Sequence, residues 1–356
     1  MEWRDILLWA AITVAAVFAG SIVARIVWRV RSELQIRRAG PRRLLAIRHR
    51  IWRDPGKVTA ETMRFGPGGS EGAPRPPFTF VEEHLAGSQP CVAVRDANRR
   101  LWRVKWGHEV RPESFAVRIA HALGYFAEVT HYVDDGVIDG AAGLTRAKSC
   151  IDADCRFREA RFELEDRDVR MHFNEHSWSW NDNPFLGTPQ LSGLKLLVML
   201  VSNWDTKDRR DVARGSNTAI FEHRVSRWSR EARYLITDWG GAMGKWGTNV
   251  VSRGRWDPEG FEAQTPQFVT GVRDDGIVTF GYVGQRTADV AYDIPVDHVR
   301  WFYELASRLK ENDLREGLLA SGADEEEAGR FARAILDRVA QLGRAANGLA
   351  LVKTAS

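Results

Sequence analysis

The chain has 356 residues, of which 44% are hydrophobic and 28% charged, and its formal net charge at pH 7 is +4. This composition is typical of a globular protein and excludes a largely disordered chain. Because the net charge is small for this length, it says little about partners. The distribution of charge along the chain says more.

The N-terminal segment, residues 1–30, is predicted to anchor the protein in a membrane. Ile6 to Ala24 carries no charge and is long enough to cross a bilayer core as a helix. Arginines cluster directly after it, which keeps that side of a span in the cytoplasm. We therefore predict a single-pass protein with a cytoplasmic body. The alternative is export after cleavage of a secretory signal, for which Val17 to Ser21 offers small residues.

Residues 31–77 are predicted to form a basic juxtamembrane arm followed by a linker. The arm carries many arginines and can lie on a membrane surface as an amphipathic helix. Since it adjoins the predicted span, anionic lipid headgroups are its expected partner, and no nucleic acid is expected. Phe65 to Pro77 is dense in Gly and Pro, which disfavour helices and central strands, so it is predicted to be a tether.

A small lobe of antiparallel strands with one helix is predicted for residues 78–140. The helical pattern opens at Pro112 and stops at Gly124, as expected for a helix with Pro near its start and Gly past its end. Runs typical of β-strands lie on both sides of it, at Phe78 to Glu82, Cys91 to Arg95, Leu101 to Trp106, Glu128 to Val133 and Gly136 to Ile138.

A larger, mostly helical lobe is predicted for residues 141–345, followed by a tail at 346–356. An apolar helix pattern ends at Val201, Asp297 is expected to cap a second helix, and Asp324 leads into the last one. Strands gathered in one lobe and helices in the other predict an α+β fold.

Two acidic clusters are expected to meet within the large lobe. The first, Ser202 to Asp208, follows the apolar helix. The second is Asp238, where a short β-type run ends in an acid followed by glycines. Ser216 to Glu222 is predicted to begin a hairpin that returns at Tyr234 to Thr237. This arrangement brings oxygen ligands to one end of a sheet, and cations that carry nucleotide phosphates bind such ligands.

A lysine in the small lobe completes the candidate site. Lys105 ends a strand and is placed to reach phosphate oxygens, and Glu113 in the next helix can hold it by an ion pair. Glu109 is the alternative partner. Asp205 is the candidate base toward a hydroxyl acceptor, with Asp208 as the alternative. We expect these groups to converge on one cleft between the two lobes.

These residues together resemble the atypical protein kinase-like fold, a group that includes HipA-type bacterial kinases, phosphatidylinositol kinases and secretory-pathway kinases. The resemblance covers residues 78–342 and rests on Val104-Lys105 with Glu113, on Asn203 to Asp208 as catalytic loop, and on Thr237 to Gly240 in place of Asp-Phe-Gly. It looks closest to a bacterial branch of the group, which implies the inner membrane for the predicted anchor.

The resemblance implies a two-lobed kinase-like fold and transfer of the γ-phosphoryl group of ATP to a hydroxyl of a protein or small molecule. It implies that Lys105 and Glu113 bind the nucleotide and that Asp205, or Asp208, acts in catalysis. It also implies that Asn217 and Asp238 hold Mg²⁺.

Two departures leave a non-catalytic, kinase-like scaffold at the membrane as the alternative. Five positions after Asp205, where such kinases commonly carry Asn, stands Arg210, which would repel a metal ion. A glycine-rich phosphate loop is also missing, with Ala86-Gly87-Ser88 as its nearest candidate. A third hypothesis is a zinc hydrolase, because His172, Glu175 and His176 follow the His-x-x-Glu-His order of inverted zinc proteases.

Overall fold

The structure is a computed structural model that describes residues 47–87, 89–165, 169–171, 177–226 and 229–348. Its strands are β1 Arg48–Arg50, β2 Phe78–His84, β3 Cys91–Arg95, β4 Leu101–Lys105, β5 Thr130–Asp139, β6 Arg156–Glu165, β7 Val169–Met171, β8 Thr218–Arg224, β9 Arg230–Ile236, β10 Val269–Val272, β11 Ile277–Phe280 and β12 Ile294–Pro295. Its α-helices are α3 Ala60–Phe65, α4 Gly69–Gly72, α5 Val110–Ala122, α6 Pro189–Leu200, α7 Pro258–Gln264, α8 Thr287–Ala291, α9 Val296–Ala306, α10 Glu311–Leu319 and α11 Glu325–Ala346.

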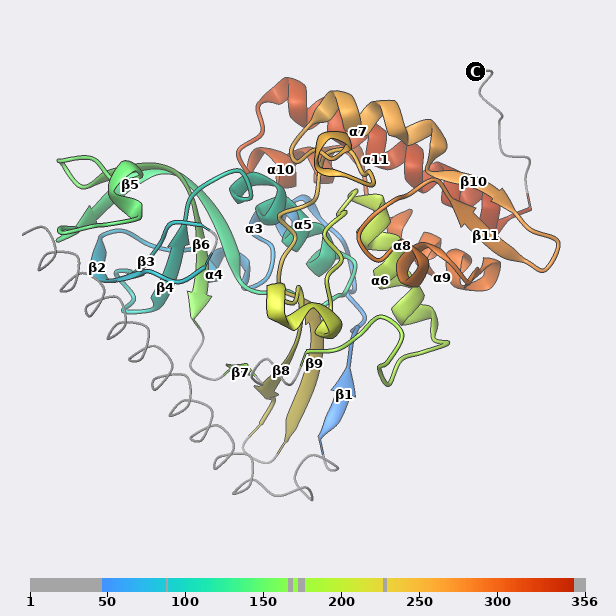
Figure 1. Ribbon diagram of the computed structural model, residues 1–356, viewed down its shortest axis with the longest axis horizontal. Helices are drawn as coiled ribbons and strands as arrows, with labels where there is room; N and C mark the ends of the chain where they lie inside the picture. Colours follow the sequence, from blue (N-terminus) through green and yellow to red (C-terminus); the bar gives the residue numbers. More distant parts are fainter. Residues whose placement is uncertain (1–46, 88, 166–168, 172–176, 227–228, 349–356) are drawn as a thin grey trace, which may run out of the picture.

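A closed barrel occupies one end of the molecule, with the strand order β2-β3-β4-β6-β5 (Figure 1). The ring closes where β2 pairs in parallel with β5, Phe78 lying opposite Ile138. Apolar side chains alternate toward the barrel interior, where Trp102, Val104 and Phe162 are fully buried. The charged residues between them therefore face away from that interior.

The helical part lies at the other end and is built around α6 (Figure 1). Apart from Lys195, this helix carries no charge, and most of its side chains are buried against the helices and loops around it. Pro189 stands in its first turn, and the Thr188 hydroxyl accepts a hydrogen bond from the Leu191 amide. The helix ends at Leu200 and delivers the chain into the loop that carries Asp205.

The two later helices begin in different ways. Asp324 leads into α11 as predicted, and it is the N-cap of this helix and forms a capping box with Glu327. The predicted cap at Asp297 is wrong. Because α9 begins at Val296, Asp297 lies in its first turn and pairs with Arg300 instead.

A four-stranded sheet, ordered β1-β9-β8-β7, stands between the barrel and the helices (Figure 1). The predicted hairpin is present as β8 and β9, with Thr218 opposite Ile236. Strand β1 pairs in parallel with β9, so chain that precedes the barrel joins this sheet. In the stretch predicted as arm and linker, Ile51 and Met63 are buried, and α3 and α4 are formed.

The predicted two-lobed kinase-like fold is wrong, although the α+β class holds. The strands do not form an open antiparallel lobe, because the parallel β2–β5 pairing closes them into a barrel. Strand β6, which the sequence analysis did not predict, supplies two of the ring's pairings. The boundary suggested at residue 140 falls between β5 and β6, inside this barrel.

The predicted membrane anchor and most of the basic arm lie outside the described residues, which begin at 47. Within the part of the chain that the structure describes, no helix combines the length and apolar character needed to span a bilayer.

Candidate functional site

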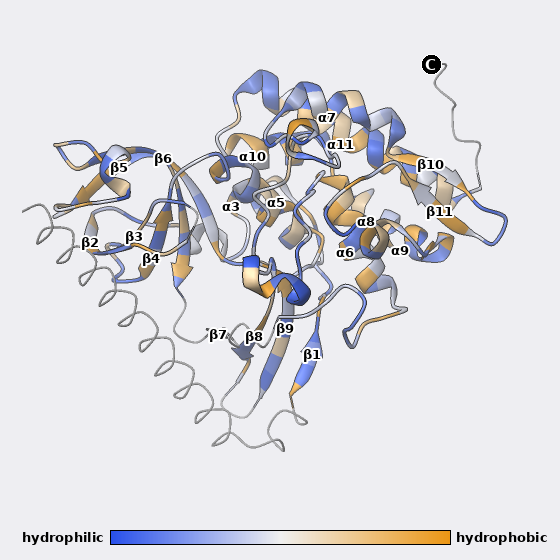
Figure 2. Cartoon of the chain, viewed as in Figure 1, coloured by the Kyte–Doolittle hydropathy of each residue, from blue (hydrophilic) through white to orange (hydrophobic). Residues whose placement is uncertain are grey.

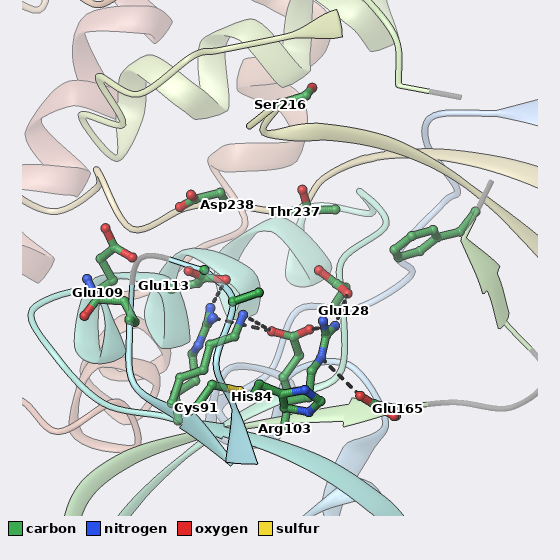
Figure 3. A pocket seen from close by; sticks show the side chains of 17 residues that line it. His84, Cys91, Arg103, Glu109, Glu113, Glu128, Glu165, Ser216, Thr237 and Asp238 are labelled. Carbon is green, nitrogen blue, oxygen red and sulfur yellow. Dashed lines mark hydrogen bonds and ion pairs between the residues drawn. The ribbon is translucent and has the colours of Figure 1, made fainter. Parts of the chain in front are cut away.

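A cavity of about 470 Å³ lies between the barrel and the four-stranded sheet (Figure 3). The barrel side is formed by residues of β3, β4 and β6 and by the start of α5. The opposite side is formed by Ser216, Phe221, Thr237 and Asp238. Lys105, Glu113 and Asp238, far apart in sequence, thus line one space. Its charged lining residues are Arg103, Lys105, Arg161, Glu109, Glu113, Glu128, Glu163, Glu165 and Asp238.

The barrel wall is an ion-pair network centred on Glu163. The Lys105 ammonium lies 3.0 Å from one Glu163 oxygen, Arg161 lies 3.4 Å from the same oxygen, and Arg103 pairs with the other. The register of β4 and β6 sets this arrangement, because Arg103 lies opposite Glu163 and Lys105 opposite Arg161. Burial alone would raise the pKa of Glu163, but the three cations lower it to about 2.

The predicted ion pair between Lys105 and Glu113 is replaced by two others. Glu113 is buried in the first turn of α5, where Arg161 pairs with its carboxylate. Lys105 pairs with Glu163 instead. An acidic residue of α5 still pairs with a basic residue of a barrel strand. That basic residue is Arg161 of β6, the strand next to β4 in the barrel.

Glu128 is a second acid on this wall and carries a different charge state. Burial, together with the nearby charge of Glu163, raises the pKa of Glu128 to about 8. Its nearest cation among the described residues, Arg103, is 4.0 Å away and is shared with Glu163 and Glu165. At neutral pH the Glu128 carboxyl is therefore protonated, and a hydrogen bond with Glu163 contributes to its raised pKa.

Asp238 and Glu109 form the acidic end of the cavity. Asp238 follows β9, and one of its oxygens accepts a hydrogen bond of 2.9 Å from the Gly240 amide. Glu109 lies just before α5, across from Asp238 (Figure 3). Burial and the charge of Asp238 raise the pKa of Glu109, which shows that the two carboxylates act on one another. Arg255 lies 3.5 Å from Glu109 and offsets part of this charge.

Asp205 lies beside this acidic end but, unlike Lys105, Glu113 and Asp238, it does not line the cavity, so the expected convergence on one cleft does not include it. It is 8% exposed, and one of its oxygens is buried without a hydrogen-bond partner. The other oxygen is 3.3 Å from the Lys207 ammonium. Burial raises the pKa of Asp205, Lys207 opposes that shift, and the charge of Asp238 adds to it. A carboxylate with a raised pKa and a free oxygen has the properties of a general base.

Asn217 links the Asp205 loop to the strand that ends at Asp238. Its side-chain amide donates a 2.7 Å hydrogen bond to the backbone carbonyl of Asp205. The backbone carbonyl of Asn217 accepts a hydrogen bond from the backbone amide of Thr237. From the other side, the Asn203 amide donates to the Asp238 carbonyl over 3.4 Å. The loop and the strand end are thereby held at a fixed separation.

Asp208 has a different environment from Asp205. It is fully buried, it caps the 3₁₀ helix Arg209–Arg214, and its oxygens accept hydrogen bonds from the Trp180 amide and from Arg210. Burial opposes them, but these bonds lower the pKa of Asp208. Arg210 also pairs with Asp289 at 2.6 Å and does not line the cavity. Asp208 thus anchors Arg210.

The acidic end suits a divalent cation that keeps waters and substrate phosphates among its ligands. It does not suit one that protein side chains enclose completely. Across the described ranges, no group of three or more His, Cys, Asp and Glu side chains is placed to enclose a metal ion. Mg²⁺, however, is usually held by one or two carboxylates together with waters and substrate phosphates. Asp238 lines the cavity and can supply one such carboxylate, whereas Asp205 and Asn217 are buried beside it and do not line it.

Several residues of the site escaped the sequence analysis. Glu163, Arg161 and Arg103 were not singled out, and neither was Lys207. The strand signal was present, since β6 alternates Arg161, Glu163 and Glu165 with apolar residues. Such alternation indicates a strand with one charged face. The turn after β2 was considered as a phosphate loop, and its Ala86 and Gly87 do line the cavity. The zinc-site residues 172–176 lie outside the described ranges.

Comparisons with protein-family models, with curated proteins and with solved structures find no match to this chain. The kinase-like resemblance drawn from the sequence therefore stays a prediction.

Proposed function

We propose that the chain binds a nucleoside triphosphate, ATP in the simplest case, together with Mg²⁺ in this cavity and transfers its γ-phosphoryl group to a hydroxyl acceptor. The observation that carries the proposal is the approach of Lys105 and Asp238 from opposite walls of one cavity, with Asp205 beside Asp238. The proposal does not depend on a kinase-like fold. It needs only cationic and acidic groups facing one another across a space of nucleotide size.

The charged residues that line the cavity favour an anionic ligand that carries a bound divalent cation. Six carboxyl groups and the three cations Arg103, Lys105 and Arg161 line the cavity. The cations gather on the barrel wall, where they suit phosphate oxygens. The carboxylates Asp238 and Glu109 gather at the other end, where Arg255 offsets only part of the charge of Glu109, and a divalent cation would offset the rest.

Each residue has a distinct part in the proposed reaction. Lys105 and Arg103 bind the phosphates, and Glu163 holds both side chains in place. Asp238 and Asn217 hold the metal, which when bound would neutralise charge on the phosphate oxygens. Asp205 orients the acceptor hydroxyl and takes its proton, and Lys207 keeps that carboxylate ionised before the reaction.

The test is ADP production by the full chain with ATP, with and without Mg²⁺. Asp238→Ala should lower turnover by at least about a hundredfold, because it removes a charge that acts on the transferring group. The control is Asp275→Ala, an exposed acid in the turn before β11 that pairs with Arg273. Its turnover should match the unmodified protein. Equal turnover in Asp238→Ala would refute the proposal.

A non-catalytic nucleotide-binding scaffold is the second candidate, and one observation favours it. The phosphate-facing cations Lys105 and Arg161 are already paired with the buried acids Glu163 and Glu113. A ligand would have to compete with these internal partners. A Mg²⁺-dependent rise in melting temperature with a non-hydrolysable ATP analogue, combined with absent ADP production, would assign this second function.

A further inference from the structure

A guanidinium is buried at the base of the loop that carries Asp205. Arg338, on α11, is 0% exposed and reaches the end of α6. One of its terminal nitrogens donates to the Leu200 carbonyl over 2.9 Å, to the Ser202 hydroxyl over 2.8 Å and to the Met199 carbonyl over 3.4 Å. These carbonyls belong to the last helical turn, whose acceptors lack partners within the helix.

The remaining donors of Arg338 bind a second segment, the chain around α7. The other terminal nitrogen donates to the Phe261 carbonyl, and Nε donates to the Thr265 hydroxyl. The guanidinium carbon stacks over the Phe261 ring at 3.6 Å. In the described part of the chain no carboxylate pairs with Arg338, so its charge is stabilised by carbonyls, a hydroxyl and aromatic faces.

The loop that Arg338 supports is fixed at successive residues. Ser202 adopts a left-handed conformation with φ 55°, which is strained for a residue with a side chain. Beyond it, the carbonyls of the next four residues accept hydrogen bonds from distant segments: Asn203 from the Tyr282 hydroxyl, Trp204 from the Gln285 amide, Asp205 from Asn217 and Thr206 from the Trp180 indole. Arg338 holds the turn from which this segment starts.

We propose that Arg338 is a positioning residue, which fixes the turn from α6 into the Asp205 loop and thereby sets where the Asp205 carboxylate lies relative to Asp238. The expected effect on turnover rests on the proposed function, whereas the expected effect on the position of the Asp205 loop does not. Displacing a reacting group by about 1 Å costs up to a hundredfold in rate. Arg338 touches neither the cavity nor any ligand in it, so it acts only through the loop.

The matched control is Arg118, a second buried arginine with the same chemistry. It is 2% exposed and donates to the carbonyls of Arg64, Ser114 and Ala320, again without a carboxylate partner among the described residues. These bonds join α3, α5 and the end of α10, and none of them reaches the Asp205 loop. Arg118→Met therefore removes a buried guanidinium and its hydrogen bonds to carbonyls elsewhere in the molecule.

The experiment compares Arg338→Met, Arg338→Lys and Arg118→Met in the full chain, below their melting temperatures. Hydrogen exchange of the Ser202, Asn203 and Asp205 amides should rise about tenfold or more in Arg338→Met, less in Arg338→Lys, and not in Arg118→Met. With ATP and Mg²⁺, kcat should fall about a hundredfold in Arg338→Met with KM for ATP nearly unchanged. In Arg338→Lys the fall in kcat should be smaller than in Arg338→Met.

The outcomes separate this inference from the proposed function. If the unmodified protein shows no turnover, the proposed function fails, and the exchange data still decide whether Arg338 holds the loop. If loop exchange is the same in Arg338→Met as in Arg118→Met, the positioning role is overturned. It is also overturned if both Met variants lower kcat equally, since the loss would then follow stability. Should Arg338→Met fail to fold, Arg338→Lys supplies the same comparison.

Discussion

At the scale of single residues, the cavity depends on acids whose charge states differ although they lie on one wall. Glu163 is buried and ionised, because three cations surround it. Glu128 lies close to it with its side chain 17% exposed, and it is protonated at neutral pH because its nearest cation is already shared. Burial disfavours the charged form of both carboxyl groups, and the number of cations within reach decides which one ionises.

This difference predicts a pH-dependent stability. The pKa of Glu128 is about 8 in the folded protein and near its usual 4.5 when unfolded, so its stabilising effect is complete below pH 4.5 and is lost as pH rises through 8. Glu128→Gln keeps a neutral group at every pH. Relative to this variant, the free energy of unfolding of the unmodified protein should fall by up to about 1.4 kcal/mol per pH unit in that window. Denaturant titrations from about pH 5 to 8 measure this difference, and parallel stability curves would contradict it.

At the scale of elements, the site is formed where β9 ends against the loop after α6. Gly241, three residues after Asp238, allows the chain to approach that loop closely. A Cβ atom on Gly241 would lie 2.7 Å from the Asn203 side-chain oxygen and 3.1 Å from the Asp205 Cβ. Contacts below 3.0 Å force a shift, and the atoms concerned are held by their own hydrogen bonds. The glycine therefore sets the spacing between the two acids.

We expect Gly241→Ala to lower the free energy of unfolding by about 2 kcal/mol through overpacking. The reason is that neither the loop nor the strand end can move without breaking hydrogen bonds. Gly72→Ala in α4 is the matched control, because a Cβ there would lie no closer than 3.7 Å to its nearest neighbour. Chemical denaturation of both variants measures the effect. A Gly241→Ala protein as stable as Gly72→Ala would show that the loop yields freely.

At the scale of the whole molecule, the segment before the barrel joins separate parts of the fold. Strand β1 completes the sheet that carries Asp238, through its parallel pairing with β9. Helix α3 places Met63 in the main hydrophobic core, against Gly317 of α10. Figure 2, which colours each residue by its hydropathy, shows apolar residues concentrated where α6 packs among its neighbours. Residues 47–65 are therefore part of the folded body.

Met63→Ala is expected to lower the free energy of unfolding of the whole body by about 2–5 kcal/mol, because a fully buried side chain leaves a cavity in a packed core. Val251→Ala is the control, since Val251 is 91% exposed and its loss should change stability by less than about 0.5 kcal/mol. Thermal melts followed by tryptophan fluorescence and by far-UV circular dichroism measure both. Unchanged stability in Met63→Ala would mean that α3 is not part of the cooperative unit.

Local patterns in the sequence determined the α+β class, most strands of the barrel, the β8–β9 hairpin and the start of the last helix after Asp324. They also brought forward Lys105, Glu113 and Asp238, which do line one cavity. Such features are set by residues near one another along the chain, whose alternation and turn residues can be recognised without a partner.

Only the tertiary structure decided barrel closure and the pairing of charges. The β2–β5 pair joins residues about sixty positions apart, and no local signal marks which strand edges meet. Glu163 pairs with Lys105 because the register of β4 and β6 places their charged faces together. Glu113 then pairs with Arg161. Ion pairs have little sequence preference of their own, so distance after folding selects the partner.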